Sequence, residues 1–326
     1  MSEIFDKNVY RDSNKKVKVI IDTDPGVDDT ACLIYALADS NIEVKLLTTV
    51  AGNISVDTST RNLLHLLDIL GRDIPVAKGA KSAMNRISPT AEFIHGKEGL
   101  GGYFPPKEAR KKVIDEDAVS AMYRVLKEGD GDIFLVALGP QTNIATLLQK
   151  HPDIKDKIPK IVIMGGSPFG NPDYFDHISF NTSSDPEAYS VLLASGIPLL
   201  VAPSHIGRFK THLDEKFVFN LKNFGDIGKL LFSMYQKYWE PNYPTKRVTT
   251  NDTAALFSLV YPKLFVTKKI KASVNTDDAP GKTSIEFVND GNILFVHDVD
   301  REAFLSLLRS ELEKMKDIKL GADFNI

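Results

Sequence analysis

Cysteine is almost absent from this sequence, which has only Cys32 among its 326 residues. A disulfide within the chain is therefore excluded. Because Cys32 lies among apolar residues of a segment that we expect to be helical, we interpret it as a buried structural thiol rather than as a nucleophile.

Long apolar runs and an excess of charge of one sign are also missing. No stretch approaches the length of a membrane span, and the first sixteen residues are polar and charged, without the apolar core of a signal peptide. The 40 basic and 43 acidic residues leave a net charge of -3 and a pI of about 6.2. This balance argues against nucleic acid or an anionic membrane as the partner. We expect a cytoplasmic protein that acts on a small soluble molecule.

Short apolar runs alternate with amphipathic segments over most of the chain. The runs predict strands at residues 17–22, 42–50, 133–138, 160–164 and 199–202, and the segments predict helices near residues 56–70, 118–127, 143–149 and 185–194. This alternation is typical of an α/β fold in which a mostly parallel open sheet carries helices on both faces. Since no linker, repeat or low-complexity tract divides the chain, we predict a polar N-terminal segment, 1–16, and a single domain, 17–326.

The C-terminal region has a different pattern. Runs 283–288 and 293–299 flank the sequence Asn289-Asp290-Gly291-Asn292, which is a strong β-hairpin signal. We therefore expect an antiparallel hairpin at the edge of the sheet, followed by a closing helix from residue 301 to about 317.

The most informative motif is Asp22-Thr23-Asp24-Pro25-Gly26-Val27-Asp28-Asp29, which places four carboxylates within eight residues directly after an apolar strand. Pro25 and Gly26 predict a sharp turn, and Asp28 and Asp29 then stand at the start of a helix, where carboxylates are favoured. The carboxyl ends of sheet strands are where open α/β folds bind ligands. A cation would offset the mutual repulsion of these acids.

Other polar residues follow the remaining predicted strands, so they should converge on the same edge of the sheet. Taken singly, each is an ordinary turn or helix-cap residue, and only the coincidence with the acidic motif raises their importance. They are Asn53, the segment 139–143, Gly165, Gly166, Asn181 with Asp185, and Asn251 with Asp252.

Three other interpretations of the acidic motif fit less well. An EF-hand loop would need Gly in place of Val27 and Glu in place of Leu33. A haloacid dehalogenase-like phosphatase, with Asp22 as nucleophile and Asp24 as acid, would have Thr or Val in place of Gly26. The glycines at 99–102 miss the dinucleotide-binding spacing. An oxygen-only site for Ca²⁺ or Mg²⁺ remains, and several carboxylates with a carbonyl suit the looser Ca²⁺ shell.

The motif Asp-x-Asp-Pro-Gly-x-Asp-Asp, matched in full at 22–29, resembles the N-terminal signature of the inosine-uridine-type nucleoside hydrolases. Further matches to this family run through most of the chain, at 51–53, 95–100, 139–145, 164–166, 181, 185–188 and 252. The resemblance implies a single Rossmann-like α/β domain that binds one Ca²⁺ and cleaves the N-glycosidic bond of ribonucleosides. We also expect a homodimer or a homotetramer.

The same resemblance implies roles for individual residues. The metal ligands would be Asp24, Asp29, Asp252 and the backbone carbonyl of Thr142. The substrate-binding residues would be Asp28, Asn53, Asn181 and Asp252 on the ribose hydroxyls, Met164 beneath the sugar, Ser179 beyond the 3′ hydroxyl and His95 as a candidate near the base.

The chemistry of the reaction supports this assignment. Cleavage of a ribosyl–base bond passes through an oxocarbenium-like sugar, so the site needs negative charge near the anomeric carbon and a positioned water. Carboxylate-bound Ca²⁺ supplies the water and grips the vicinal hydroxyls, and Asp24, a ligand beside that water, is the natural general base.

Two positions depart from the family pattern. Ser179 stands where the family usually has Glu, and Asn251 stands where a His commonly serves as the leaving-group acid. We therefore predict a ribonucleoside hydrolase of altered base or 5′-group specificity, with Asp24 and Asn251 at the catalytic positions. The alternatives are a ribosyl-binding protein that kept the metal and lost turnover and, more distantly, the phosphatase.

Two further segments are candidates for the pocket. Residues 203–208 bring His205 and Arg208 to the end of a strand, although a solvated loop is the simpler interpretation. Tyr235, Tyr238 and Trp239 could stack on a base, although aromatics at helical spacing usually belong to a core.

Overall fold

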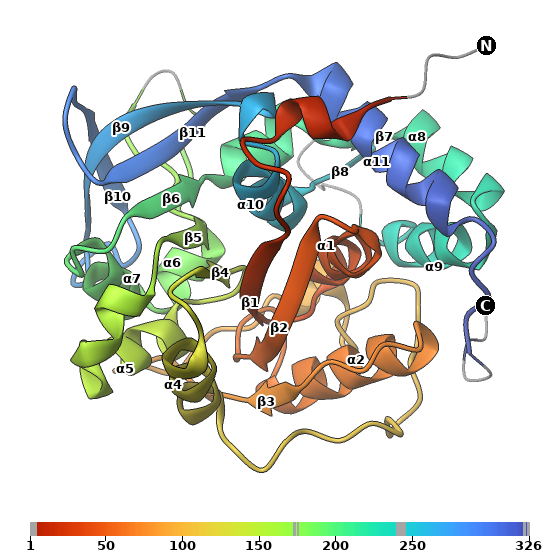
Figure 1. Ribbon diagram of the computed structural model, residues 1–326, viewed down its shortest axis with the longest axis horizontal. Helices are drawn as coiled ribbons and strands as arrows, with labels where there is room; N and C mark the ends of the chain where they lie inside the picture. Colours follow the sequence, from red (N-terminus) through yellow and green to blue (C-terminus); the bar gives the residue numbers. More distant parts are fainter. Residues whose placement is uncertain (1–4, 172–173, 175, 239–245, 322–323, 325–326) are drawn as a thin grey trace.

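The structure, a computed structural model, describes residues 5–171, 174, 176–238, 246–321 and 324. A nine-stranded sheet, with strand order β10-β9-β11-β6-β5-β4-β1-β2-β3, runs through the molecule (Figure 1). Its strands are β1 Val17–Thr23, β2 Ile42–Thr49, β3 Val76–Lys78, β4 Ile133–Ala137, β5 Ile161–Met164, β6 Leu199–Ala202, β9 Phe265–Val274, β10 Thr283–Phe287 and β11 Ile293–Val299. The short strands β7 Leu213–Asp214 and β8 Arg247–Val248 form a separate antiparallel pair.

Helices cover both faces of the sheet, as predicted. The main ones are α1 Val27–Ala38, α2 Val56–Ile69, α4 Ala118–Glu128, α5 Thr142–Lys150, α7 Pro186–Leu193, α9 Gly225–Tyr235, α10 Asn251–Val260 and α11 Arg301–Met315; α3 Glu92–His95, α6 Phe180–Ser184 and α8 Glu215–Asn220 are short. None of the helices described combines the length and the apolar character needed to cross a membrane.

Two hydrophobic cores lie on opposite sides of the sheet, and β1 contributes to both. Val19 and Ile21 pack in the core that contains α1, α2, α9, α10 and α11, whereas Ile20 packs in the core that contains α4, α5 and α7. Because successive side chains of a strand point to opposite faces, a strand covered on both sides reads as a continuous apolar run. This is why β1 was recognisable in the sequence.

The order of the strands explains where a ligand can bind. The central strand β1 pairs in parallel with β2 on one side and with β4 on the other, so the chain changes direction across the sheet at this point. A crevice forms outside the carboxyl ends of the strands at such a switch point. The acidic motif leaves β1 there.

The C-terminal antiparallel hairpin is present, but its partners differ from the expected ones. β10 pairs with β9, and β11 also pairs with β9 along its other edge, so β10 and β11 are not paired with each other. The segment 288–292 crosses from one edge of β9 to the other, where Ile270 faces both Phe287 and Ile293. The long strand β9 offers hydrogen-bonding groups on both edges, and these outweigh the local turn signal.

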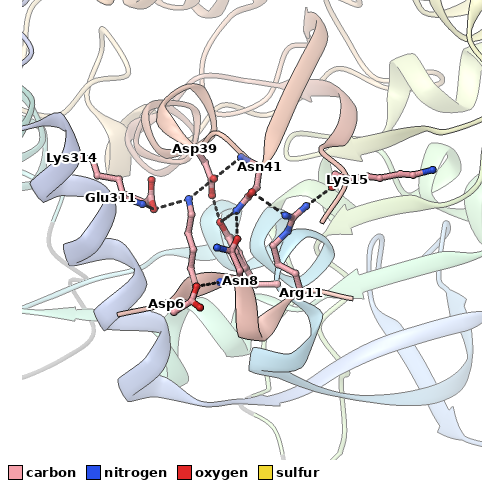
Figure 2. Close-up of polar contacts among 10 residues, drawn as sticks. Asp6, Asn8, Arg11, Lys15, Asp39, Asn41, Glu311 and Lys314 are labelled. Carbon is pink, nitrogen blue, oxygen red and sulfur yellow. Dashed lines mark hydrogen bonds and ion pairs between the residues drawn. The ribbon is translucent and has the colours of Figure 1, made fainter. Parts of the chain in front are cut away.

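Part of the polar N-terminal segment is anchored to the domain. Lys7 is buried, and its ammonium group lies 2.5 Å from Asp39 Oδ1 and 2.8 Å from Glu311 Oε1. Figure 2 labels both carboxylates. Arg11 donates to Asn41 Oδ1 at 2.9 Å. These contacts tie the segment to the end of α1 and to α11.

Candidate functional site

A cavity of about 420 Å³ opens at the carboxyl ends of the central strands. Eleven of the residues named individually in the sequence analysis line it: Asp28, Asp29, Asn53, His95, Met164, Ser179, Asn181, Arg208, Tyr238, Asn251 and Asp252. The structure therefore brings together residues that are spread over more than two hundred positions of the chain.

Three carboxylates form the acidic wall of this cavity. Oxygens of Asp28 and Asp29, from the first turn of α1, and of Asp252, from the first turn of α10, lie within 4.8 Å of one another. Burial, and then the neighbouring Asp29, raise the pKa of Asp28 to about 7. The pKa of Asp252 is raised well above its usual value by burial and by the nearby carboxylates. A cation in this wall would relieve that cost.

Asp29 holds the acidic turn in shape. Its Oδ1 accepts from the Thr23 hydroxyl at 2.6 Å and from the Asp24 amide at 3.2 Å. Its Oδ2 accepts from the Gly26 amide at 3.2 Å and from Asn53 Nδ2 at 2.9 Å. One carboxylate thus connects β1, the start of α1 and the loop after β2, and the sequence motif acquires a fixed geometry.

Asp24 lies fully buried behind this wall rather than in the lining of the cavity. Its Oδ2 accepts from the Asn53 amide at 2.6 Å, whereas its Oδ1 has no hydrogen-bond partner among the described residues. Burial, and then the charge of Asp29, raise its pKa well above the usual value. A buried carboxylate oxygen without a hydrogen-bond partner destabilises the folded protein. Because the candidate ligands around it are all oxygens, the position fits a hard cation such as Ca²⁺.

Two glycines leave room for the Asp24 carboxylate. A Cβ at Gly52 would lie 2.0 Å from Asp24 Oδ2, and a Cβ at Gly139 would lie 2.6 Å from Asp24 Oδ1. No larger residue fits at either position without moving the carboxylate. The glycines of the motifs 51–53 and 139–143 therefore have a steric function.

Thr142 does not reach the acidic wall. Its hydroxyl donates to Asp185 Oδ2 at 2.6 Å, and its backbone carbonyl accepts from the Thr146 hydroxyl at 2.7 Å inside α5. Leu138, directly after β4, lines the cavity, and its carbonyl accepts from Asn181 Nδ2 at 2.5 Å. Thr142 is not among the described residues that line the cavity, so Leu138 is a second candidate for the backbone oxygen, four residues earlier in the chain.

Met164 and Asn181 form the floor of the cavity. Besides its bond to Leu138, Asn181 Nδ2 lies 3.3 Å from the Met164 carbonyl oxygen and 3.1 Å from Met164 Sδ. These contacts fix the amide at the end of β5. Asp185, which the sequence had grouped with Asn181, instead caps α7 by accepting from the Ala188 amide at 3.0 Å.

Aromatic residues form a second wall. The rings of His95 and Tyr238 lie 5.0 Å apart, and His95 Nδ1 accepts from the Val27 amide at 3.1 Å. Nδ1 is thus unprotonated, and Nε2 carries the proton of the neutral ring. Burial lowers the pKa of His95 to about 4. Tyr235 is buried in the core, and Trp239 lies outside the described residues.

Asn251 connects the aromatic and acidic walls. Its Nδ2 lies 3.3 Å from Asp28 Oδ2, and its Oδ1 is buried without a hydrogen-bond partner among the residues described. Gly207 packs against it, since a Cβ at Gly207 would lie 2.3 Å from Asn251 Oδ1. The Asn251 side chain is therefore held at the cavity, and its Oδ1 can still accept a hydrogen bond.

A third wall is formed by His177, Ser204 and Arg208. The sequence analysis offered Arg208, in the segment 203–208, as a candidate for the pocket, but it missed His177. His205, the histidine that it did single out beside Arg208, is not among the residues described as lining the cavity; it packs on Tyr174 and Phe209. The only signal for this wall was the position of residues 203–208 directly after a strand.

Comparisons with known proteins agree with this arrangement. The family model described as inosine-uridine preferring nucleoside hydrolase matches residues 19–306. The chain is 34% identical over 309 residues to the pyrimidine-specific ribonucleoside hydrolase RihA of Enterobacter sp. strain 638, covering 90% of this chain and 97% of that protein.

Solved structures give the same result. A purine-preferring ribonucleoside hydrolase from Gardnerella vaginalis superposes with a TM-score of 0.83 at 31% identity, covering 92% of this chain and 99% of that one. A plant nucleoside hydrolase superposes with a TM-score of 0.81 at 31% identity, covering 91% and 98%. The chain therefore belongs to the family of inosine-uridine preferring nucleoside hydrolases, enzymes that hydrolyse ribonucleosides.

Proposed function

We propose that the protein hydrolyses the N-glycosidic bond of ribonucleosides in a Ca²⁺-dependent reaction, with altered base or 5′-group specificity. The observation that carries this proposal is the acidic wall of Asp28, Asp29 and Asp252, backed by the unpartnered Oδ1 of Asp24. Buried carboxylates at this spacing are expected to ionise together only around a cation.

The donor set suits Ca²⁺. Asp24, Asp29 and Asp252 would hold the ion, and the Leu138 carbonyl is the backbone oxygen available to them in place of the Thr142 carbonyl. The ion would supply positive charge that polarises a water and attracts two vicinal hydroxyls.

The residues of the chain position the sugar. Asp28 lies at the edge of the acidic wall, where it can accept from a ribose hydroxyl, and the hydrogen bonds from Asn251 and Tyr238 orient its carboxylate. Asn181, fixed over Met164, presents its amide from the floor. A deoxyribose would lose a hydrogen bond at this wall, so we expect a preference for ribose.

Asp24 is the proposed general base. Its Oδ2 is occupied by the Asn53 amide, which leaves Oδ1 as the oxygen that can take a proton from the attacking water. The negative charge of the surrounding carboxylates also stabilises the positive charge that develops on the sugar ring.

Neither Asn251 nor His95 can act as a strong general acid that protonates the leaving base. The Asn251 amide donates a hydrogen bond but not a proton, and His95 is neutral at pH 7 because its pKa is lowered to about 4. His95 Nε2–H can therefore hydrogen-bond a leaving group without transferring a full proton to it. We infer that leaving groups that depart readily as anions are cleaved better than purines.

A ribosyl-binding protein without turnover is the alternative, and the amide at position 251 is the observation that favours it. The deciding experiment incubates the Ca²⁺-loaded protein with a panel of ribonucleosides and p-nitrophenyl riboside and measures the reducing sugar released. Release from at least one substrate supports hydrolysis, whereas binding of ribose without release from any substrate would support the alternative. Assembly as a homodimer or homotetramer and a cytoplasmic location stay predictions, and light scattering tests the first.

A further inference from the structure

The third wall of the cavity differs from the other two in its chemistry. Among the described residues that line the cavity, the carboxylates are Asp28, Asp29 and Asp252, and all three belong to the acidic wall. His177, Ser179, Ser204 and Arg208 line the cavity as well; His177 and Ser179 come just before α6, and Ser204 and Arg208 follow β6. The cavity is therefore polarised, with acids at the β1 end and a cation with hydroxyls at the β6 end.

We propose that the third wall, together with Ser179, is a subsite for an anionic group, a phosphate, on the 5′ carbon of the ribosyl substrate. The inference rests on the ribosyl specificity proposed above. It assigns the 5′-monophosphate of a ribonucleoside as a substrate in preference to the ribonucleoside itself.

Ser179 carries the first part of the argument. It is 2% exposed and lines the cavity, and its hydroxyl has no hydrogen-bond partner among the described residues. A buried hydroxyl is normally hydrogen-bonded, so one left without a partner at a cavity wall indicates a ligand atom there. A phosphate oxygen accepts such a bond.

The hydroxyl of Ser204 extends the same wall. It lies 2.5 Å from His177 Nε2 and 2.7 Å from the Ser167 hydroxyl, so histidine and two serines form one hydrogen-bonded chain at the rim. Such a chain adjusts its donors to an acceptor that approaches it, because hydroxyl hydrogens rotate. It supplies a hydroxyl donor at the cavity, which Arg208 also lines.

Arg208 supplies the charge. It stands in the π-helical turn Ile206–Lys210, which the Thr211 amide closes by donating to the Ile206 carbonyl at 2.9 Å. Turns of this type are rare and are frequent at functional sites. The planar guanidinium matches the geometry of a phosphate, which it binds through two parallel hydrogen bonds.

The orientation of the sugar places its 5′ carbon at this wall. The vicinal hydroxyls belong at the acidic wall, and the base belongs at the aromatic wall of His95 and Tyr238, where a flat ring can stack. The remaining substituent of the ring, the 5′ carbon, then points to the wall of Ser179 and Arg208. Strand order agrees, because β4 and β5 separate β1 from β6.

The test compares p-nitrophenyl riboside with its 5′-phosphate, since this pair removes the identity of the base from the measurement. We expect the ratio of kcat/KM for the phosphate to that for the riboside to exceed one, and to fall about tenfold to a hundredfold in Arg208→Gln. Lys210→Gln is the matched control: it removes a cation from the same turn that pairs with Asp298 at 3.1 Å and does not line the cavity, so the ratio should not change.

A second measurement separates this inference from the proposed function. Calorimetric titration with ribose 5-phosphate and with ribose reports the subsite without turnover, and Arg208→Gln should weaken only the first ligand. If the riboside is hydrolysed but its phosphate is rejected, the subsite is refuted and hydrolysis stands. If neither is hydrolysed, the proposed function fails, and equal affinity for ribose and ribose 5-phosphate in that case also refutes the subsite.

Discussion

Gly52 offers a direct test of the position of the Asp24 carboxylate. In Gly52→Ala the new Cβ would lie 2.0 Å from Asp24 Oδ2, whereas ordinary van der Waals contact begins at 3.4 Å. The carboxylate or the loop must therefore shift by more than about 1 Å, and a displacement of that size in a catalytic group costs on the order of 10²-fold in rate. Because Gly52 has no positive φ, alanine adds no backbone strain there.

The assay measures kcat/KM on p-nitrophenyl riboside and Ca²⁺ affinity by calorimetry, with thermal melting as the check on folding. Gly291→Ala is the control, because its Cβ would meet Ile270 O at 3.4 Å, far from the cavity. A Gly52→Ala protein with kcat/KM within about threefold of the unmodified enzyme would refute the assigned position, since the 10²-fold cost then never appears.

Other expected outcomes follow from the same geometry. Asp24→Ala removes a ligand and the base together, so the rate should fall by more than the ~10²–10⁴-fold of general base catalysis, and a loss below tenfold would assign the base elsewhere. Exhaustive chelation should abolish turnover; full activity with no metal by elemental analysis contradicts the site. Asn251→His should raise inosine turnover and leave p-nitrophenyl riboside nearly unchanged, and no gain with inosine would count against the leaving-group argument. Lys7→Met leaves the buried Asp39 carboxylate without its cation and removes one of the two cations beside Glu311, so it should lower the free energy of unfolding in urea by about 3 to 5 kcal/mol, against less than about 1 kcal/mol for the half-exposed Lys314→Met.

Local patterns predicted the sheet well where strands are covered on both faces. β1 and β6 appear as short apolar runs, and their bounds agree with the prediction to within one residue. β9 was missed because Lys268, Lys269 and Lys271 interrupt its pattern, and these side chains are exposed. Its place in the sheet is set by pairing with both β10 and β11, which the local sequence pattern does not show.

The site was predictable as far as side-chain chemistry identifies it. Asp28, Asp29 and Asp252 could be chosen because their carboxylates are distinctive, but a backbone carbonyl looks the same at Leu138 as at Thr142. Only the path of the chain after β4 decides between them. His177 lies 31 positions before Arg208, and nothing local indicates that the ends of β5 and β6 bring them to one wall.

The buried contacts of Lys7 with Asp39 and Glu311 have a consequence for folding during synthesis of the chain. Its contact with Glu311 closes a loop of 304 residues, so the third charge of the cluster arrives only when α11 has emerged from the ribosome. Until then the ion pair of Lys7 and Asp39 lacks the Glu311 carboxylate, and water can hydrate both groups. The N-terminal segment is therefore held less firmly to the domain. The segment that carries Lys7 is thus the last to be fixed to the domain. In a nascent or truncated chain without α11, we expect a protease to cleave this segment first.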